Sequence, residues 1–373
     1  MGFFKRQKID WILISATLPL LFGGLVTMNV FLGESIFFRR QLLWIIVSLL
    51  VFFTLSFIDF RFLRKKGIIV SIFIFSCFVL TALFVLGTVV RGAQSWFHLG
   101  SVAFQPSDLA KLVIILVLAK YFTRRHIEIA HIRHILVSGF YAFILFLLIL
   151  LQPDFGSSII IFIIWFGMVL VSGISKKHLL AVCTIGVLVF SGLWFFGFKE
   201  YQKERIISFI HPLADLKGSG YNAYQSTIAV GSGGFLGKGV GYGTQSRLKF
   251  LPEYQTDFIF AAFAEEWGFI GILLLFLLFG IIVYRILVNA IRGPTNFEIL
   301  YGIGLSIYFM SHFVINVGMN IGILPVTGLV MPFMSYGGSH LLAEFTGLGI
   351  LMGMRRYQRV AHKDDVKNEF LGI

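Results

Sequence analysis

The sequence predicts an all-α integral membrane protein, and its composition and hydropathy pattern are the observations that predict it. Of the 373 residues, 57% are hydrophobic and 13% are charged, whereas soluble globular domains carry about 25% charged residues. Apolar stretches long enough for a helix to cross about 30 Å of hydrocarbon recur along the chain. They lack the two-residue alternation of a transmembrane β-barrel. We therefore expect one polytopic membrane domain over residues 1–373.

Ten apolar segments have the length expected of membrane-spanning helices. They cover residues 11–32, 41–58, 68–89, 107–123, 136–152, 155–173, 178–197, 258–284, 298–320 and 339–354. Lys5, Arg6 and Lys8 precede a full-length first segment, and no small-residue cleavage site opens the chain. The first segment is therefore expected to be an uncleaved anchor. Cys77 and Cys183 lie in apolar runs and are too few for a disulfide framework or a zinc site.

The distribution of Lys and Arg predicts the orientation of these helices. Of the 31 basic residues, 20 lie on the side of the N-terminus, ten lie in the alternate loops, and Lys111 lies within a predicted helix. Seven of the ten belong to residues 198–257, a loop long enough to escape the charge rule. Both termini are therefore expected in the cytoplasm, and the 198–257 loop, between the seventh and eighth helices, outside. Contact with anionic membrane lipids explains the net charge of +13 without a nucleic-acid partner.

Residues 198–257 form a polar interruption that holds nine of the 39 glycines. Successive glycine amides in residues 231–239 can form an anion-binding nest, and Lys238 and Arg247 can add charge-assisted contacts to phosphate. A merely flexible loop is the alternative interpretation. The loop ends at Asp257, where a carboxylate either caps the eighth helix or serves chemistry at the membrane surface.

Ionisable residues inside the predicted helices indicate where a site could lie. Lys111 follows Asp108 by three residues on the same helical face, and such residues in a membrane are usually partnered functional groups that face the bundle interior. A purely structural, self-neutralising pair is the alternative. Around the eighth helix, Glu265 lies about 80° from Asp257 and Glu266 about 180°. We therefore expect Glu265 to line an inward cavity and Glu266 to meet a neighbouring helix.

Polar side chains also recur in the last two predicted helices. His312, Asn316 and Asn320 follow one another at four-residue spacing, which gives one stripe on the ninth helix. His340 and Glu344 form a similar pair on the tenth. Such stripes usually provide hydrogen bonds between membrane helices, and we expect that role here rather than a metal site.

Several long motifs in the chain resemble those of the SEDS family (shape, elongation, division and sporulation). They are residues 104–107, 152–154, 225–234, 237–239, 243–246, 250–260, 316–328 and 332–339. The stretch 243–246 before Leu251-Pro252-Glu253, with the short tails, is more similar to the elongation members than to the division members. The resemblance implies a peptidoglycan glycosyltransferase of the bacterial cytoplasmic membrane, which polymerises the undecaprenyl-pyrophosphate-linked precursor lipid II. It also implies a class B penicillin-binding protein as the crosslinking partner.

The same resemblance assigns roles to individual residues. Asp257 matches the essential aspartate of the family and is the predicted general base. Lys111 matches a functionally important lysine, and Asp108 stands where many relatives have glutamate. The full set of predicted substrate-binding residues is Lys111, Asp108, Arg247, Lys238, Gln245, Ser246, Glu253 and Asp154. The pyrophosphate leaving group needs cationic stabilisation, which basic residues, glycine amides or a divalent cation such as Mg²⁺ or Mn²⁺ can supply.

Three departures from the family pattern affect the predicted site. Ser95 and Ala103 stand where relatives often carry arginine, so two outer-face cations are missing, and Arg91 is expected to compensate for one of them. Asp108 is one methylene shorter than the glutamate of many relatives. His340 and Glu344 match no family motif, and we leave them outside the predicted site.

Two other functions are compatible with a chain of this kind. A lipid II flippase requires polar groups through the full depth of the membrane, whereas the polar residues here concentrate on the outer side. A non-catalytic scaffold for the penicillin-binding protein would tolerate the loss of Asp257. Synthesis of glycan strands by an Asp257→Asn variant distinguishes these alternatives from the enzyme.

Overall fold

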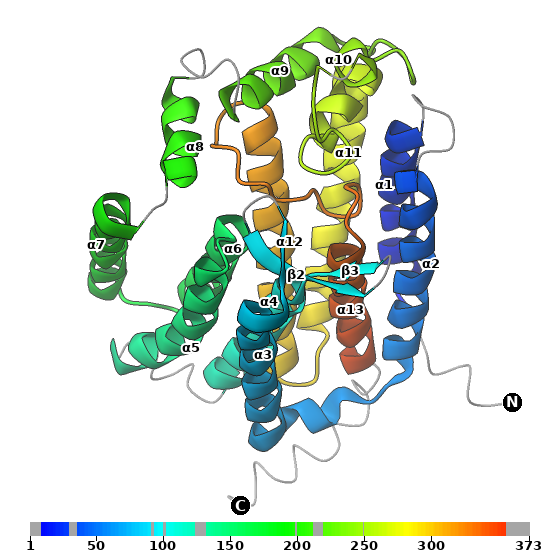
Figure 1. The fold of residues 1–373 in the computed structure, drawn as a ribbon. Coiled ribbons are helices and arrows are strands. Elements are labelled where there is room, and N and C mark those ends of the chain that lie inside the picture. Colours follow the sequence, from blue (N-terminus) through cyan, green and yellow to red (C-terminus); the bar gives the residue numbers. More distant parts are fainter. Residues whose placement is uncertain are drawn as a thin grey trace, which may run out of the picture.

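The computed structural model shows an elongated bundle of helices (Figure 1). It describes residues 9–29, 36–90, 93–99, 102–123, 132–197, 200–211, 219–248 and 250–355. Within these residues, each of the ten predicted segments contains a helix. The helices are α1 (Trp11–Asn29), α2 (Ile36–Phe57), α3 (Lys66–Leu86), α4 (Pro106–Thr123), α5 (Ile132–Leu151), α6 (Phe155–Val171), α7 (Lys176–Gly192), α11 (Ile259–Ile291), α12 (Asn296–Asn320) and α13 (Gly338–Arg355).

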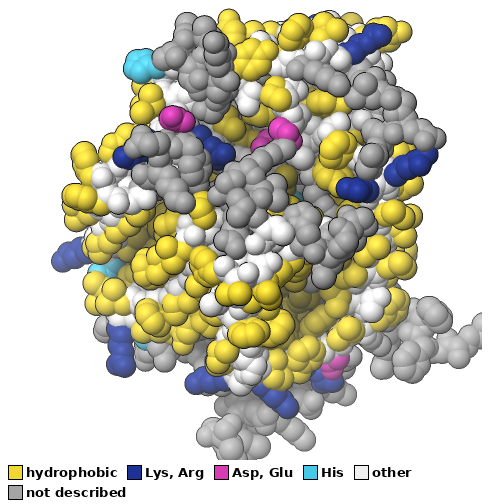
Figure 2. Space-filling view, viewed as in Figure 1, with side chains coloured by type: hydrophobic (Ala, Val, Ile, Leu, Met, Phe, Trp, Pro, Cys, Tyr) yellow, Lys and Arg dark blue, Asp and Glu magenta, His cyan; other side chains and the backbone are white. Residues whose placement is uncertain are grey.

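The length and composition of these helices suit a membrane. Among the described residues, seven spans are long and apolar enough to cross a bilayer, those of α1, α2, α3, α5, α7, α11 and α12. The span of α7 continues through the π-helix η3 (Leu193–Gly197). Helix α6 is apolar but has only 17 residues. Figure 2 shows that hydrophobic side chains cover most of one face of the molecule, with few charged side chains between its two ends.

Two parts of the chain fold in ways that the hydropathy pattern did not predict. A three-stranded antiparallel sheet, in the order β1 (Thr88–Val90), β2 (Ala93–Leu99) and β3 (Val102–Phe104), connects α3 to α4. The prediction of an all-α fold is wrong in this detail, because strands of three to seven residues are too short to show in a helix-length window. A short 3-10 helix, η2 (Phe60–Arg64), connects α2 to α3 at the other end of the bundle.

The loop over residues 198–257 contains three helices that lie at one end of the bundle. They are α8 (Glu200–Ile210), α9 (Ser219–Ser232) and α10 (Thr244–Arg247). Figure 1 shows α9 and α10 above the start of α11 and the end of α12. Helix α7 stands apart from the main bundle in the same view, and none of its described side chains is buried.

Helix α12 is at the centre of the packing, against α4, α6 and α11. Small residues allow this close approach: a Cβ at Gly304 would collide with Ile115 of α4 and Met168 of α6. On the other face of α12, a Cβ at Gly302 would collide with Ala290 of α11. Small residues at helix contacts are typical of membrane bundles, where packing rather than hydrophobic burial drives association. This packing fixes the position of α12 relative to α4 and α11, whose ends carry the predicted site residues.

Helix α11 is interrupted at Gly268, and the glycine-rich loop closes the interruption. Gly268 has a φ of 64°, a backbone conformation that glycine adopts without steric cost. The amides of Phe269 and Ile270 donate to carbonyls of residues 234 and 235, and the amides of Lys238 and Gly239 donate to carbonyls of residues 265 and 266. Unpaired backbone groups are expensive inside a membrane protein. The glycine-rich run therefore has a structural role, because these two loop amides donate to α11.

Candidate active site

A large cavity opens at the end of the bundle that carries the 198–257 loop. Its volume is about 1010 Å³, and its wall is formed by the start of α4, the start of α6, one face of α2, and residues that precede α11 and α13. Five of the predicted site residues line it, namely Asp108, Lys111, Asp154, Glu253 and Asp257. The tertiary structure thus brings together residues that are up to 149 positions apart, from 108 to 257.

Asp108 and Lys111 form a buried ion pair in the wall of the cavity. Pro106 begins α4, as expected of proline at the first helical position, and this start places Asp108 and Lys111 one turn apart. Lys111 Nζ lies 3.0 Å from Asp108 Oδ1, and the two side chains are 1% and 5% exposed. Ser339 Oγ donates to Asp108 Oδ2 at 2.9 Å. Because both members of the pair line the cavity, the pair is placed to meet a ligand.

Asp257 is held at the cavity through its backbone. Asn316 and Asn320 both donate from Nδ2 to the carbonyl oxygen of Asp257, at 3.0 Å and 3.1 Å. Asn320 also accepts from the amide of Ala261 at 3.1 Å, so the stripe on α12 fixes the first turn of α11. The N-cap residue of α11 is Phe258 rather than Asp257. The side chain of Asp257 is half-buried and lines the cavity.

Asp154 lines the same cavity and is the last residue of the turn that connects α5 to α6. It is the N-cap residue of α6 and accepts from the amide of Ser157 at 3.0 Å. Gln105 Nε2 donates to its other oxygen at 2.7 Å. Asp154 therefore joins the start of α6 to the start of α4, and its role in substrate binding stays a prediction.

The turn that leads into Asp257 supplies further polar groups. Glu253 is exposed at the cavity and has a φ of 54°, a left-handed conformation that is uncommon for a residue with a side chain. Its carbonyl accepts from the amides of Thr256 and Phe258. Burial raises the pKa of the neighbouring Tyr254 phenol, so this hydroxyl stays protonated at neutral pH.

Four predicted site residues belong to the loop that folds over Glu265 and are not among the described residues that line the cavity. Lys238 Nζ lies 2.7 Å from Glu265 Oε1, and the amides of Thr244 and Gln245 donate to this carboxylate at 2.8 Å and 3.1 Å. Ser246 and Arg247 belong to the same short helix, α10. The described residues that line the cavity include none of Lys238, Gln245, Ser246 and Arg247. Their part in substrate binding stays a prediction that this geometry does not favour.

The expectations for the two neighbouring glutamates have opposite outcomes. Glu265 is fully buried and is not among the described residues that line the cavity, so the prediction that it faces an inward cavity is wrong. The reason is that the loop folds back over α11 and saturates its carboxylate with donors. Glu266 meets Thr27 of α1 at 3.4 Å, so the prediction that it faces a neighbouring helix is confirmed.

The cavity also contains residues that sequence reasoning left out. His340 lies 3.3 Å from Asp108, from Nδ1 to Oδ1, and His312, Arg40 and Arg205 line the wall with it. The spacing of His340 and Glu344 on one helical face was visible in the sequence, but their contact with α4 was not. Ser95 and Ala103, where relatives often carry arginine, line the cavity too. Arg91, the residue expected to compensate, lies outside the described residues.

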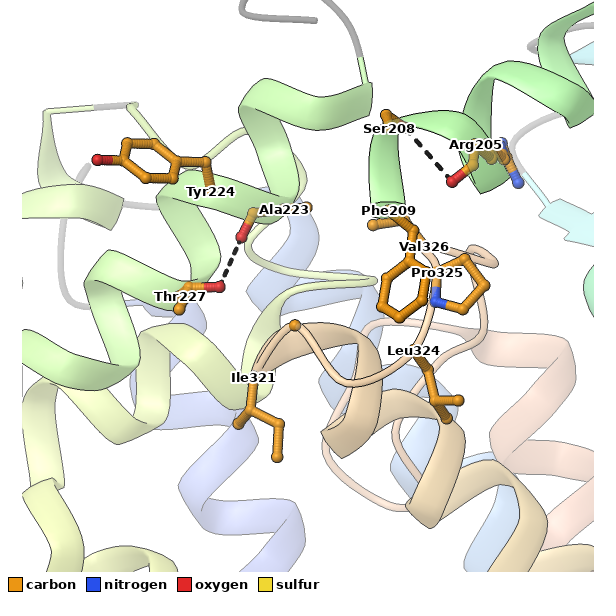
Figure 3. Close-up of a pocket in the computed structure, with 11 residues that line it drawn as sticks. Arg205, Ser208, Phe209, Ala223, Tyr224, Thr227, Ile321, Leu324, Pro325 and Val326 are labelled. Atoms are coloured by element: carbon orange, nitrogen blue, oxygen red, sulfur yellow. Dashed lines mark hydrogen bonds between the residues drawn. The ribbon is translucent and has the colours of Figure 1, made fainter. Parts of the chain in front are cut away.

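A smaller cavity of about 250 Å³ lies beside the large one (Figure 3). Residues of α8 and α9 form one side, and residues 321–326 after α12 form the other. Figure 3 shows Phe209 of α8 next to Pro325, with Tyr224 and Thr227 of α9 on the other side of the view. Arg205 lines both cavities, and its guanidinium donates to the carbonyl of Thr327 at 3.4 Å. Arg205 thus lies at the boundary between the two spaces.

A divalent cation held by protein side chains does not fit the residues of this site. Within the part of the chain that the structure describes, no three His, Cys, Asp or Glu side chains gather in a way that could hold a metal ion. Two of the cavity carboxylates, Asp108 and Asp154, already accept from lysine, serine, glutamine and backbone donors. We therefore derive no chemical step through a bound metal.

The fold and the cavity define a class: a multi-pass membrane protein with a large cavity at one end of the helix bundle, whose lining includes carboxylates and cations. Residues 12–360 match the family model described as cell cycle protein, which comprises FtsW, RodA and SpoVE. The chain belongs to this family, the SEDS family, and the resemblance seen in its motifs is confirmed. It is a multi-pass protein of the bacterial cytoplasmic membrane.

Named relatives and solved structures place the chain more closely within the family. It is 39% identical over 293 residues to peptidoglycan glycosyltransferase MrdB of Escherichia coli, which covers 78% of this chain and 79% of that protein. It is 34% identical to stage V sporulation protein E of Bacillus subtilis, over 95% of this chain and 99% of the other. The structure is similar to that of Thermus thermophilus rod shape determining protein RodA, with a TM-score of 0.70, 28% identity, and 94% and 97% of the two chains covered.

A second similar structure is described as showing the structural coordination of polymerization and crosslinking by a peptidoglycan synthase complex. Its chain matches this one with a TM-score of 0.80 and 29% identity, and the match covers 95% of this chain and 99% of that one. The two structures therefore share their fold over nearly the whole length of both chains.

Proposed function

We propose that this chain is a peptidoglycan glycosyltransferase, which polymerises lipid II into glycan strands during cell elongation. The names of its relatives, including MrdB and RodA, support this activity and the elongation role. The observation that carries the proposal is that Asp257, Lys111 and Asp108 line the same large cavity. A carboxylate and a cation at one site are the groups that transfer from a pyrophosphate-linked sugar requires.

The proposed topology has ten spans, with both termini in the cytoplasm and the 198–257 loop outside. The direction of the helices supports it, because α4 and α11 begin beside the cavity and end at the opposite end of the bundle. Described basic residues at that opposite end include Arg61, Arg64, Lys65, Lys66, Lys120, Arg285, Arg292 and Arg355. An excess of Lys and Arg is typical of the cytoplasmic side, which supports the proposed outer position of the cavity.

In the proposed reaction, the 4-hydroxyl of an acceptor N-acetylglucosamine attacks the anomeric carbon of the donor N-acetylmuramic acid. The hydroxyl proton passes to the carboxylate of Asp257, and the bond from the anomeric carbon to the undecaprenyl pyrophosphate breaks. A positioned general base contributes about 10²- to 10⁴-fold to such a step. A single displacement of this kind inverts the anomeric centre.

Negative charge develops on the pyrophosphate as it leaves, and cations in the cavity wall can stabilise this charge. Lys111, Arg40 and Arg205 all line the wall. Preorganised charges act strongly in a site with little water, because they are already oriented when the transition state forms. Lys111 is the most buried of the three, so its contact is expected to contribute most.

The long lipid tails of the substrate need a path from the cavity into the bilayer. Leu43 and Val47 of α2 line the cavity and are also 63% and 42% exposed at the surface of the molecule. An apolar opening at this place lets a polyprenyl chain lie in the membrane while its pyrophosphate stays in the cavity. The proposed entry route therefore passes along α2.

The proposed partner is a class B penicillin-binding protein that crosslinks the strands. The structural relative from a peptidoglycan synthase complex supports this proposal. Helix α7, which stands apart from the bundle (Figure 1), and the adjacent helices of the outer loop leave apolar surface uncovered.

The decisive experiment is strand synthesis from purified lipid II by the chain together with its penicillin-binding partner. Asp257→Asn should lower the rate at least 100-fold while the thermal midpoint and partner binding stay unchanged. Asp59→Asn, which alters a carboxylate at η2 far from the cavity, is the control and should polymerise normally. Full activity of Asp257→Asn would refute the base assignment and return the flippase and scaffold alternatives to consideration.

A further inference from the structure

A cluster of buried polar side chains lies directly behind the Asp108–Lys111 pair. His340 of α13 contacts the carboxylate of Asp108, and Glu344 of α13 and Tyr308 and His312 of α12 in turn contact His340. His312 and Glu344 are fully buried, and His340 is 5% exposed. The proposed reaction uses none of these four residues.

His340 lies between two carboxylates. Its Nδ1 is 3.3 Å from Asp108 Oδ1 and 3.4 Å from the hydroxyl of Tyr308. Its Nε2 is 3.0 Å from Glu344 Oε1, close enough for an ion pair, although the angles do not suit a hydrogen bond. The other oxygen of Glu344 accepts from the amide of Phe333 at 3.2 Å. Glu344 is thereby fixed to the backbone, and it faces the imidazole.

Asp108 Oδ1 is shared between Lys111 and His340. The distances are 3.0 Å from Lys111 Nζ and 3.3 Å from His340 Nδ1, whereas Oδ2 accepts from Ser339. When His340 carries a proton on Nδ1, Asp108 Oδ1 accepts from two donors and attracts each of them less strongly than an oxygen that accepts from a single donor. His340 therefore reduces the hold of Asp108 on the lysine, which leaves the ammonium able to contact a second anion.

The surroundings of His340 restrict the orientation of its ring. The ring of His312 lies 4.5 Å from that of His340, centroid to centroid. His312 itself is anchored by a contact of 3.3 Å between its Nδ1 and the carbonyl oxygen of Val330. Side-chain groups that must hold a catalytic geometry need such support from their neighbours.

We propose that His340 is a positioning residue for glycosyl transfer, which shares the carboxylate of Asp108 with Lys111 and so presents the lysine ammonium to the pyrophosphate of the donor. Glu344 holds the imidazole in the orientation that makes this sharing possible. The inference rests on the proposed function, because it assigns the pyrophosphate contact to Lys111. Neither His340 nor Glu344 belongs to the motifs that identified the family.

Two substitutions of His340 separate this role from simple packing. In His340→Asn the side-chain amide nitrogen can occupy the place of Nδ1, so the contact with Asp108 is kept and the one with Glu344 is lost. In His340→Gln the amide nitrogen can occupy the place of Nε2, so the reverse holds. We expect kcat/KM for lipid II within about threefold of wild type for His340→Asn and about tenfold lower for His340→Gln, mainly through a higher KM.

The measurements are polymerisation of lipid II by the complex with its penicillin-binding partner, and the thermal midpoint of each variant in detergent. Equal kcat/KM values for the two folded variants would overturn the proposal, because packing alone does not distinguish them in this way. Glu344→Gln, which keeps the shape of the side chain, provides a second test if a His340 variant does not fold. It should raise KM about threefold, and an unchanged KM would also overturn the proposal.

Asp257→Asn is measured in the same assay, so that two kinds of failure can be told apart. If Asp257→Asn is fully active, the proposed base is wrong, whatever the His340 variants do. If Asp257→Asn is inactive and the two His340 variants behave alike, only the positioning role of His340 is wrong.

Discussion

Two of the ion pairs in the described part of the chain join a lysine to a buried carboxylate, Asp108–Lys111 and Glu265–Lys238, with N–O distances of 3.0 Å and 2.7 Å. In both pairs the carboxylate is nearly or fully buried. The pairs differ in what surrounds them. The carboxylate of Glu265 accepts from loop amides and hydroxyls, whereas Asp108 and Lys111 form part of the wall of a cavity of about 1010 Å³.

This difference shows that the role of a buried ion pair depends on its neighbours more than on its own chemistry. The Glu265–Lys238 pair attaches the 198–257 loop to the interrupted helix α11, since the amides of that loop also donate to α11 carbonyls. The Asp108–Lys111 pair forms part of the cavity wall on one side. Burying two charges is costly even when they are paired. Of these two pairs, Asp108–Lys111 is the one for which ligand binding gives a reason to retain the charges. Four predictions test this comparison.

The largest effect is expected from Lys111→Met, which removes the cation from the cavity. We expect kcat/KM for lipid II to fall about 100-fold, because a hydrogen bond to a charged group contributes about 1.5–3 kcal/mol. Strand synthesis with the penicillin-binding partner measures it. The double variant Lys111→Met, Asp108→Asn also removes the buried negative charge that has lost its lysine, and it should fold better yet remain impaired. Wild-type activity in the double variant would remove Lys111 from the mechanism.

The next effect is expected from Glu265→Gln, which breaks the other pair. The free energy of unfolding should fall by about 2 kcal/mol, because Lys238 loses its partner and the loop amides lose a charged acceptor. Thermal unfolding in detergent measures the change. Activity per folded molecule should stay within about twofold of wild type. Glu253→Gln, at an exposed carboxylate, should leave the thermal midpoint unchanged. A stable but inactive Glu265→Gln would contradict the structural role.

A smaller effect is expected from Asn316→Ala, which removes donors to the carbonyls of Asp257 and Leu329. We expect kcat to fall about tenfold with little change in KM, because small displacements of a catalytic group are costly. Steady-state kinetics with lipid II provides the test. Asn289→Ala is the matched control, since Asn289 is equally buried but donates to Asp10 instead. The idea fails if the two variants lose the same fraction of kcat.

The smallest effect concerns Asp10, which precedes α1. Burial alone would raise the pKa of Asp10, but hydrogen bonds from Arg285, Asn289 and the amide of Leu13, with the charge of Arg285, lower it overall. A carboxyl with a lowered pKa stabilises the fold above its unfolded pKa of about 3.9, and this contribution is lost as the pH falls through the folded pKa. The difference in thermal midpoint between wild type and Asp10→Asn should be largest near pH 7 and shrink below about pH 4. If the difference in thermal midpoint stayed constant across this pH range, the ionisation of Asp10 would not contribute to stability in this way.

Local patterns predicted a large part of the fold and part of the site. Hydropathy located all ten helical segments within the described residues, because helix length and apolar composition are properties of a continuous stretch. The three-residue spacing of Asp108 and Lys111 predicted their contact, since helical geometry brings such positions together. The family motifs located Asp257 at the end of the 198–257 loop, and the structure places it in the cavity wall.

The sequence by itself thus determined the class of protein, its family and the residues that begin α4 and α11. Only the tertiary structure decided which charged groups meet. Asp108 and His340 are 232 positions apart in the chain, and Lys238 reaches Glu265 only because the glycine-rich loop folds back over the break in α11. Short-range periodicity contains no information about such contacts, because they depend on how close-packed helices, held by residues such as Gly302 and Gly304, are arranged around one another.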